Sequence, residues 1–213
     1  MKTHLAFAVA GAILLTACGS KTDVNEKNFG AAMKQYFEKK GELCLGLRKW
    51  PADVSQEDLK AQKDDPTNMA GKMEALVAVG LVSGTDTEID QLHWASNKPT
   101  GRKLMVKRYA LTDAGKKFHR EWERDQEQVS DICYGNLALD KIVKWEGPMK
   151  RGDYQEARVT YLYEIDDLAG WAKKSEIQTA FPKVGKIIGG AEKKEQKHQV
   201  KLTSLGWEAK GLD

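Results

Sequence analysis

The chain has 213 residues, of which 34 are lysine or arginine and 31 are aspartate or glutamate, so its formal net charge is only +3. A balance this close to neutrality argues against a dedicated nucleic-acid-binding protein, which concentrates a basic excess. Hydrophobic residues make up 41% of the chain and charged residues 31%, a composition that excludes a disordered or collagen-like chain. The length admits one large domain or two small ones, and three cysteines are too few for a disulfide-dense scaffold.

The N-terminus has a short polar start followed by an apolar run from Leu5 to Leu15. A run of about 11 residues is shorter than the roughly 20 that span a bilayer as a helix, but it matches the apolar region of an export signal. The run ends in Leu15-Thr16-Ala17-Cys18, which resembles the lipobox of bacterial lipoproteins. We therefore predict a signal peptide over residues 1–17, cleaved between Ala17 and Cys18, and a tether over residues 18–27.

The lipobox resemblance implies that Cys18 is acylated on its sulfur with fatty-acyl chains such as palmitate. Two or three chains anchor a protein firmly, because each buried methylene contributes about 0.8 kcal/mol and one chain binds only marginally. Gly19 follows the cysteine, and by the same resemblance a residue other than aspartate favours the outer membrane. The expected location is the cell envelope, with the protein held in the outer membrane and facing the periplasm. A cleaved, soluble secreted protein is the alternative.

Two further cysteines, Cys44 and Cys133, belong to the mature chain. Disulfides persist in the oxidising compartments outside the cytoplasm, and a single pair allows one intramolecular bond. We predict a Cys44–Cys133 disulfide, which would close a loop of about 90 residues and stabilise the fold by about 4 to 5 kcal/mol in the chain-entropy model. The alternative is two unrelated buried thiols that act as small hydrophobic side chains.

Hydrophobic periodicity predicts helices and hairpins along the mature chain. Apolar residues at helical spacing mark amphipathic helices, and strict alternation marks strands. Asn97 to Gly101 supply turn residues, Thr112 is a predicted helix N-cap, and Pro182 blocks continuation of a helix. In chain order the predicted elements are helices over 28–41 and 64–80, a hairpin of strands 87–95 and 103–112, a helix over 113–125, a hairpin of strands 139–145 and 157–165, a helix over 167–179, and a strand over 199–203.

Residues 65–125 resemble the winged-helix domain of bacterial regulators. A helix, Gly80-Leu81-Val82, a hairpin and the phrase from Tyr109 to Gly115 (YALTDAG) occur in the order of those domains. The resemblance implies the fold, and a fold alone does not determine the function. The hairpin carries the basic residues Lys98, Arg102, Lys103, Lys107 and Arg108. An exported protein normally meets no DNA, so we expect no nucleic-acid partner and interpret these charges as protection of an edge strand.

Three short motifs recur in the same order and suggest an internal duplication of about 90 residues, with coincidence as the alternative. They are Cys44-Leu-Gly46 and Cys133-Tyr-Gly135, Lys49-Trp50 and Lys144-Trp145, and Leu111-Thr112-x-x-Gly115 and Leu202-Thr203-x-x-Gly206. The predicted fold class is α+β, built from two winged-helix-like units of helix plus β-hairpin. The predicted domains are a helix-rich winged-helix-like domain over 28–130 and an α+β domain over 131–213, which would be a divergent repeat of the first.

The sequence contains no local grouping that predicts catalysis. His93, His119 and His198 form no H-E-x-x-H motif, and neither a G-x-S-x-G elbow nor a Walker-type phosphate loop occurs. We therefore expect a non-enzymatic protein with no cofactor and no metal site. An enzyme whose site is assembled from distant residues remains the alternative, because such a site leaves no local signature.

Six tryptophans are a heavy load for this length, and Trp50 and Trp94 lie near loop segments. An exposed tryptophan is a credible anchor for a partner, so both are candidate interaction residues, whereas Trp122 and Trp145 are expected in the core. The leading hypothesis is a membrane-anchored envelope lipoprotein that presents an interaction or structural surface to an envelope protein. One alternative is an inhibitor or immunity lipoprotein against a periplasmic hydrolase. Another is a small-ligand-binding lipoprotein or an enzyme without a local motif.

Overall fold

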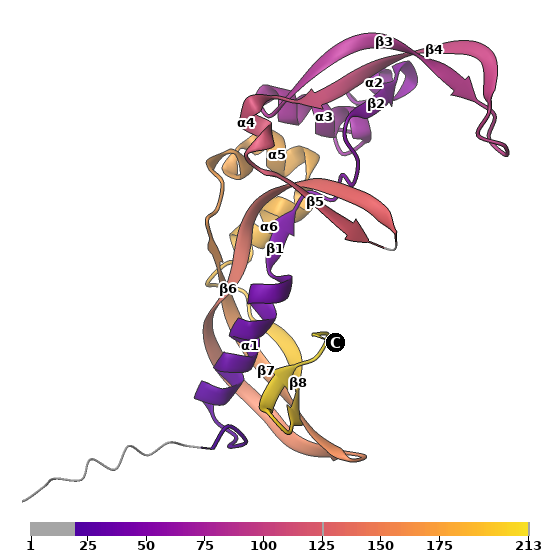
Figure 1. The fold of residues 1–213 in the computed structure, drawn as a ribbon. Coiled ribbons are helices and arrows are strands. Elements are labelled where there is room, and N and C mark those ends of the chain that lie inside the picture. Colours follow the sequence, from indigo (N-terminus) through magenta and orange to yellow (C-terminus); the bar gives the residue numbers. More distant parts are fainter. Residues whose placement is uncertain (1–19, 125, 213) are drawn as a thin grey trace, which may run out of the picture.

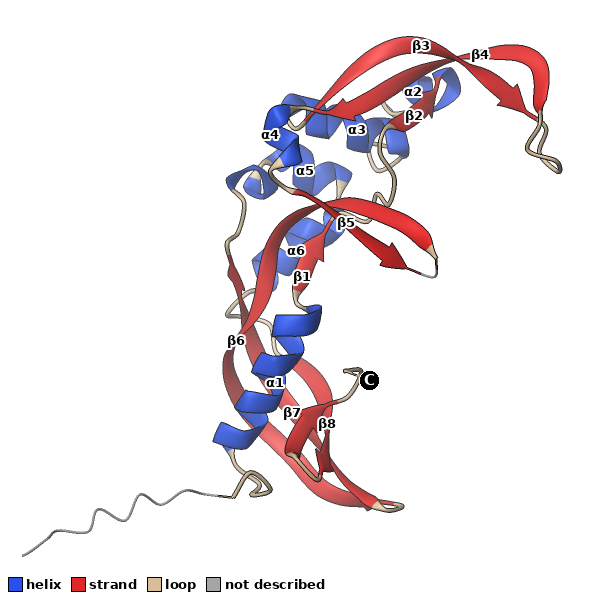
Figure 2. Cartoon of the chain, in the orientation of Figure 1, coloured by secondary structure: helices blue, strands red, loops and turns tan. Residues whose placement is uncertain are grey.

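The molecule is elongated and curved, and long hairpins project from it (Figures 1 and 2). The computed structural model describes residues 20–124 and 126–212. The helices are α1 (Glu26–Lys40), α2 (Gln56–Ala61), α3 (Met69–Ala78), α4 (Asp113–Lys116), the 3-10 helix η1 (Gly170–Lys173), α5 (Ser175–Ala180) and α6 (Pro182–Gly190). The strands are β1 (Glu42–Cys44), β2 (Ala52–Ser55), β3 (Val82–Leu92), β4 (Pro99–Leu111), β5 (His119–Arg124), β6 (Glu127–Arg151), β7 (Tyr154–Asp166), β8 (Gln196–Thr203) and β9 (Gly206–Ala209).

The larger sheet is built around β6, which is 25 residues long. Its order is β1-β6-β7-β8-β9, with β5 also paired to β6, and all of its pairings are antiparallel. The first part of β6 pairs with β5 and β1, and the remainder pairs with β7, where Leu139 lies opposite Tyr163. The predicted hairpin of strands 139–145 and 157–165 is therefore confirmed.

Helix α1 packs against β6 and β9 of this curled sheet. Asn25 caps the helix, because its side chain accepts a hydrogen bond from the Asn28 N–H at 2.8 Å. The ring of Phe29 is fully buried and makes edge contacts with Trp145 and Trp207, with centroid separations of 5.4 and 5.0 Å. The helix predicted from residue 28 is thus confirmed, and its packing joins the beginning of the described chain to the last strand.

A second sheet, of order β2-β4-β3, projects at the other end of the molecule (Figure 1). Its β3 and β4 pair from Val82 opposite Leu111 to Leu92 opposite Pro99, which confirms the predicted hairpin. We call β3, β4 and the connecting residues 93–98 the arm. The predicted helix over 64–80 is also confirmed as α3, whose N-cap Asn68 accepts a hydrogen bond from Gly71 N–H at 2.8 Å.

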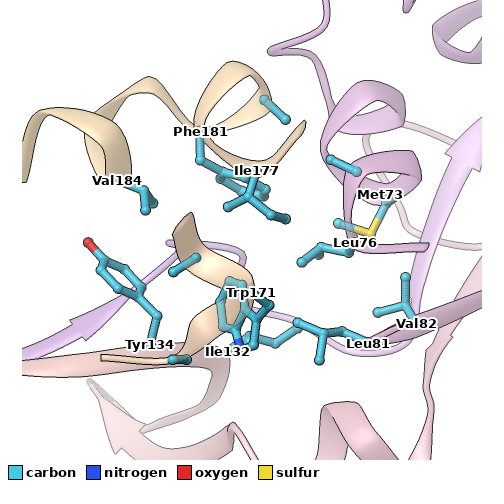
Figure 3. Close-up of a cluster of buried hydrophobic side chains, with 14 of the residues drawn as sticks. Met73, Leu76, Leu81, Val82, Ile132, Tyr134, Trp171, Ile177, Phe181 and Val184 are labelled. Carbon is cyan, nitrogen blue, oxygen red and sulfur yellow. The ribbon is translucent and has the colours of Figure 1, made fainter. Parts of the chain in front are cut away.

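Two clusters of buried hydrophobic side chains hold the molecule together. One lies between α1 and the larger sheet and includes Phe29 and Val159. The other joins α3 and the base of the arm to η1, α5 and α6, and includes Leu76, Trp171 and Ile177 (Figure 3). Because the second cluster draws side chains from residues 43 to 184, the arm is fixed to segments that lie far from it in the sequence.

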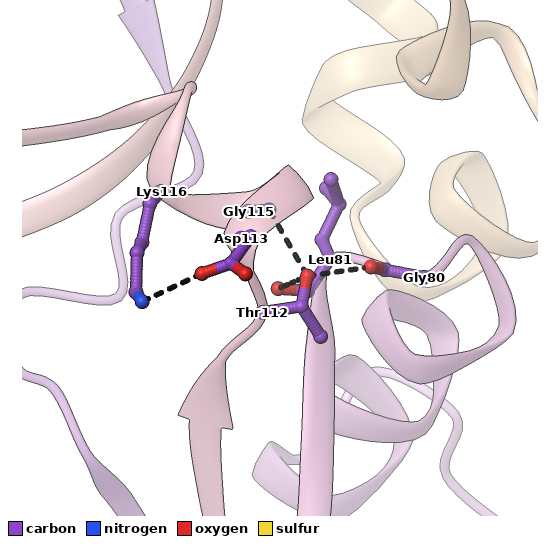
Figure 4. A network of polar contacts seen from close by, with 6 residues as sticks. All are labelled: Gly80, Leu81, Thr112, Asp113, Gly115 and Lys116. Atoms are coloured by element: carbon purple, nitrogen blue, oxygen red, sulfur yellow. Dashed lines mark hydrogen bonds and ion pairs between the residues drawn. The ribbon is translucent and has the colours of Figure 1, made fainter.

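Thr112 is a helix N-cap, as predicted (Figure 4). Its hydroxyl oxygen accepts a hydrogen bond from the Gly115 N–H at 3.1 Å and lies 2.7 Å from the Gly80 carbonyl oxygen, to which it can donate. An ion pair between Asp113 and Lys116 (2.8 Å) spans the single turn of α4. These contacts connect the end of the arm to the end of α3.

The helix predicted over 113–125 is wrong beyond its first turn. Helix α4 ends at Lys116, and residues 119–124 form β5. Pairing with β6, in which Trp122 lies opposite Val129, provides the backbone partners of this segment. Tertiary pairing therefore overrides the helical preference of its many charged residues.

The helix predicted over 167–179 is also corrected. The structure has η1, α5 and α6 in this region. Helix α5 ends at Ala180, before Pro182, as the proline predicted. Pro182 then begins α6, because a first-turn position needs no backbone N–H donor. The predicted last strand over 199–203 is confirmed as part of β8, which forms a hairpin with β9.

The fold class is α+β, mostly strands in a curled antiparallel sheet with helices beside it. The predicted pair of related copies is not shown, because the strand orders differ: β2-β4-β3 in one half and β7-β8-β9 in the other. Thr112 caps a helix, whereas Thr203 lies at a hairpin turn and donates to the Gly206 carbonyl (3.0 Å). The predicted domain boundary between residues 130 and 131 falls within β6, and the two-domain division stays a prediction. No helix in the described part of the chain is long and apolar enough to cross a membrane.

Candidate functional site

The predicted lipidation residue Cys18 and the cleavage residue Ala17 lie outside the described residues. The predicted disulfide is present and joins Cys44 of β1 to Cys133 of β6. The two cysteines face each other across adjacent antiparallel strands. The bond therefore fastens β1, from which the chain leaves the larger sheet for the arm, to β6, the strand with which β1 pairs.

Trp94 lies in the turn at the tip of the arm, where 90% of its surface is exposed. The ring of His93 stacks against it at a centroid separation of 6.1 Å. Leu92, at the end of β3, is 52% exposed. The tip therefore presents two large apolar side chains, and a role of Trp94 in binding a partner stays a prediction.

Ion pairs neutralise much of the basic charge that the sequence places on the arm. They join Lys103 to Asp90 (2.7 Å), Lys107 to Glu74 (2.6 Å) and Arg108 to Asp53 (2.6 Å). The hydrogen bond from Arg108 holds the pKa of Asp53 below its usual value. No such pair is found among the described residues for Lys98 and Arg102, which lie near the tip. The two basic residues of the arm without such a pair are therefore those nearest its tip.

Trp50 is less accessible to a partner than Trp94, and Trp122 and Trp145 are more exposed than predicted. Trp50 is half-buried and packs against the cluster of Figure 3, so it is not free to insert into a partner. Trp122 and Trp145, expected in the core, are 36% and 37% exposed. Both lie in β-hairpins, and the ring of Trp145 contacts that of Phe29 in α1.

The arrangement of titratable groups offers no evident catalytic constellation in the described part of the chain. The histidines His93, His119 and His198 lie on three separate strands or turns. The one close group of metal-ligand residue types found there is Glu42, Cys44 and Cys133. Its sulfurs are bonded to each other, and a metal requires them as thiolates.

A cleft of about 510 Å³ lies beside the disulfide. Segments far apart in the sequence form it: β1, the start of α3, β6, and the junction of α5 and α6. Its wall is largely apolar and is made by Leu43, Leu45, Tyr134, Ala180, Phe181, Val184 and Ile187, with Cys44 beside them. Glu42, Thr67, Lys72 and Lys183 contribute the charged and polar groups of its lining.

Tyr134 is the most deeply placed polar side chain of this cleft. It is only 2% exposed and extends from β6 toward Val184 of α6 (Figure 3). Burial, with a smaller contribution from Tyr163, raises the pKa of Tyr134 to about 12, so the hydroxyl is protonated at neutral pH. No hydrogen bond joins this hydroxyl to another described residue, and it is not among the buried side-chain atoms that lack a partner, so it keeps contact with solvent.

Sequence reasoning did not find this cleft. Lys72, Tyr134 and Lys183 belong to different elements, and no local motif connects them. The only signal close to it was the pair of cysteines, one of which lines the cleft. Comparisons with protein-family models, with curated proteins and with solved structures found no match to this chain.

Proposed function

We propose that this chain is a non-enzymatic lipoprotein of the bacterial cell envelope, anchored through acylated Cys18, that binds a protein partner with its arm. The observation that carries the proposal is the tip of the arm, where Trp94 is 90% exposed. Transfer of such a side chain from water into a partner's pocket contributes about 1.5 to 3 kcal/mol. Tryptophan and arginine are the residue types that most often dominate binding energy, and Arg102 lies near the same tip.

The position of the arm supports this proposal. The described chain begins at Ser20 at one end of the molecule, and the arm lies at the opposite end (Figure 1). A lipid anchor at Cys18 would therefore hold the molecule at the end where the described chain begins, and the arm would extend away from the membrane into the periplasm. The lipobox resemblance favours the outer membrane for this anchor. The disulfide is consistent with a location outside the cytoplasm.

Metabolic labelling with a clickable fatty acid tests the anchor. Wild-type protein should incorporate the label and fractionate with the outer membrane, whereas Cys18→Ala should lose both properties. Asp140→Ala, at an exposed position of β6, serves as the control, because it leaves the lipobox and both disulfide cysteines intact. Label retained by Cys18→Ala would contradict the anchoring proposal.

A photo-crosslinking amino acid at position 94 tests the partner. It should give one discrete crosslinked product in intact cells, and the same group at exposed Val143 of β6 should not. The product at position 94 should weaken when Arg102→Glu is added, because the substitution reverses a charge beside the anchor. Absence of a product at position 94 under several growth conditions would contradict the proposal.

The same arm fits the inhibitor or immunity hypothesis, in which the tip would insert into a hydrolase. In that case the product at position 94 would contain a hydrolase, and deletion of the gene would sensitise cells to it.

We also infer a winged-helix-like unit over residues 65–125. The order of helix α3 and the β3–β4 hairpin within these residues supports this inference. The pairing of three of the arm's five basic residues with acids supports a role other than DNA binding.

A further inference from the structure

The cleft beside the disulfide has the features of a built ligand site and is distinct from the arm. Its volume of about 510 Å³ lies within the roughly 300 to 1,000 Å³ typical of small-molecule sites. Such sites combine an apolar wall with a few polar groups that fix the orientation of the ligand. The cleft has both, because aliphatic and aromatic side chains form most of its lining and Tyr134 lies among them.

The Tyr134 hydroxyl is a donor available to a ligand in the cleft. No hydrogen bond joins it to another described residue, and it is not among the buried side-chain atoms that lack a partner, so it keeps contact with solvent although Tyr134 as a whole is only 2% exposed. A ligand with an acceptor oxygen in the cleft would satisfy this donor.

The charges of the lining indicate the sign of that ligand. Lys72 and Lys183 line the cleft together with one acid, Glu42. The Glu42 carboxylate is engaged by Arg120, whose Nε lies 3.6 Å from it. The Lys72 ammonium lies 5.8 Å from the centre of the Phe181 ring, directly at the apolar wall. The cleft is therefore net positive where its polar and apolar parts meet.

We propose that this cleft binds a small amphipathic carboxylate, whose apolar body packs between Leu43, Phe181 and Val184 while its carboxylate accepts hydrogen bonds from Tyr134 and the two lysines. Charge-assisted hydrogen bonds of this type are about twice as strong as neutral ones. The bound ligand would bridge α3, β6 and α6, the elements that fix the arm to the larger sheet. This site is independent of the arm's proposed role, and either proposal can fail without the other.

Ligand-observed NMR titration of the purified full chain tests the proposal with 4-phenylbutyrate and 4-phenyl-1-butanol. The two probes share a skeleton and differ only in the head group. The carboxylate should bind at least about fivefold more tightly, since one charge-assisted hydrogen bond contributes about 1 kcal/mol or more. Equal affinities for the two probes, or no binding of either, would overturn the proposal.

Substitutions assign the binding to the cleft. Lys183→Gln, at an exposed position, should weaken the carboxylate about threefold to tenfold and leave the alcohol unchanged. Tyr134→Phe, which keeps the ring, should weaken the carboxylate about fivefold. Val184→Trp should abolish binding of both probes by filling the cleft. Lys34→Gln is the matched control, because Lys34 lines a different cleft between α1 and β6 and its loss should change nothing.

Circular dichroism and thermal unfolding separate loss of binding from loss of fold. Lys183→Gln and Tyr134→Phe should retain the wild-type spectrum, so their effect on affinity is interpretable even if Val184→Trp unfolds. Binding that is equally strong in all four variants would mean that the probes associate elsewhere, and would overturn the assignment.

Discussion

A single buried carboxylate, that of Asp131, organises the chain where it leaves β1. The residue is 3% exposed and its two oxygens accept hydrogen bonds from the Gly46 N–H (2.6 Å) and the Leu47 N–H (3.2 Å). One oxygen also accepts from the N–H of Ile132 (2.8 Å). The carboxylate thus provides acceptors for the N–H groups of Gly46 and Leu47, which lie beyond the end of β1. Asp131 precedes the disulfide-bonded Cys133 by two residues in β6.

Asp131→Ala should lower the free energy of unfolding by about 3 kcal/mol, because it removes three hydrogen bonds to a charged acceptor, one of them from the buried N–H of Ile132. Asp131→Asn keeps one acceptor oxygen and should cost only about 1 kcal/mol. Urea unfolding followed by circular dichroism measures both. Asp140→Ala, at an exposed position of the same strand, is the control and should change stability by less than about 0.5 kcal/mol. Similar losses for Ala and Asn at position 131 would contradict this account.

At the scale of elements, Glu74 joins α3 to β4. One of its carboxylate oxygens accepts hydrogen bonds from the Tyr109 hydroxyl (2.5 Å) and the Lys107 ammonium (2.6 Å). Burial opposes the charged form of Glu74, but these two donors outweigh it and leave its pKa below the ordinary value of 4.5. Burial and the contact with Glu74 raise the pKa of Tyr109, so it remains a donor at neutral pH.

Because the pKa of Glu74 is lower in the folded than in the unfolded chain, its contribution to stability is present above about pH 4.5 and is lost as the pH falls through the folded-state pKa. Glu74→Gln should therefore lower the free energy of unfolding by about 1 kcal/mol at pH 7. The difference from wild type should shrink at pH 3. Urea unfolding at both pH values measures this. An equal difference at pH 7 and pH 3 would show that the carboxylate's charge is not responsible.

The elements that the sequence predicts correctly are those whose pattern and tertiary role agree. The arm is an example, because alternation in its strands and the turn residues from Asn97 to Gly101 indicate the same hairpin that the structure contains. The segment after Thr112 is the counterexample. Phe118 and Trp122 stand one helical turn apart among charged residues that favour a helix. Pairing of β5 with the long strand β6 decides the structure there, and a local pattern cannot contain that pairing.

The candidate sites divide in the same way. Trp94 could be found because a turn signal and an aromatic residue stand next to each other in the sequence. The disulfide followed from the number of cysteines and the predicted compartment. The cleft could not be found, because Lys72, Tyr134 and Lys183 come together only after α3, β6 and α6 have packed. The position of the Tyr134 side chain in the lining of the cleft depends on the whole fold.

At the scale of the whole molecule, the arm is part of a long insertion between β1 and β6, two strands that are neighbours in the larger sheet. Strands β1 and β6 pair directly, yet β2 to β5 and α2 to α4 lie between them in the sequence. The interactions that hold the arm to the larger sheet lie at the base of this insertion. The buried cluster of Figure 3 provides the noncovalent part, and the Cys44–Cys133 bond provides the covalent part.

The disulfide joins the two ends of this insertion, and its cysteines are separated by 89 residues in the sequence. In the chain-entropy model, a closure of that length removes enough freedom from the unfolded chain to stabilise the fold by about 4.5 kcal/mol. The double variant Cys44→Ala/Cys133→Ala should lose about that much in urea unfolding. Wild type in reducing agent should approach the same value, whereas reducing agent should not affect the double variant.

The single variants separate loop closure from packing. Cys133 is 7% exposed, so Cys133→Ala removes the bond and also some buried side-chain volume, whereas Cys44→Ala removes the bond from a half-buried position. If closure dominates, both single variants should match the double variant within about 1 kcal/mol, because the bond is lost once in each case. A loss that is large for Cys133→Ala and small for Cys44→Ala would instead assign the stabilisation to packing at the base of the arm.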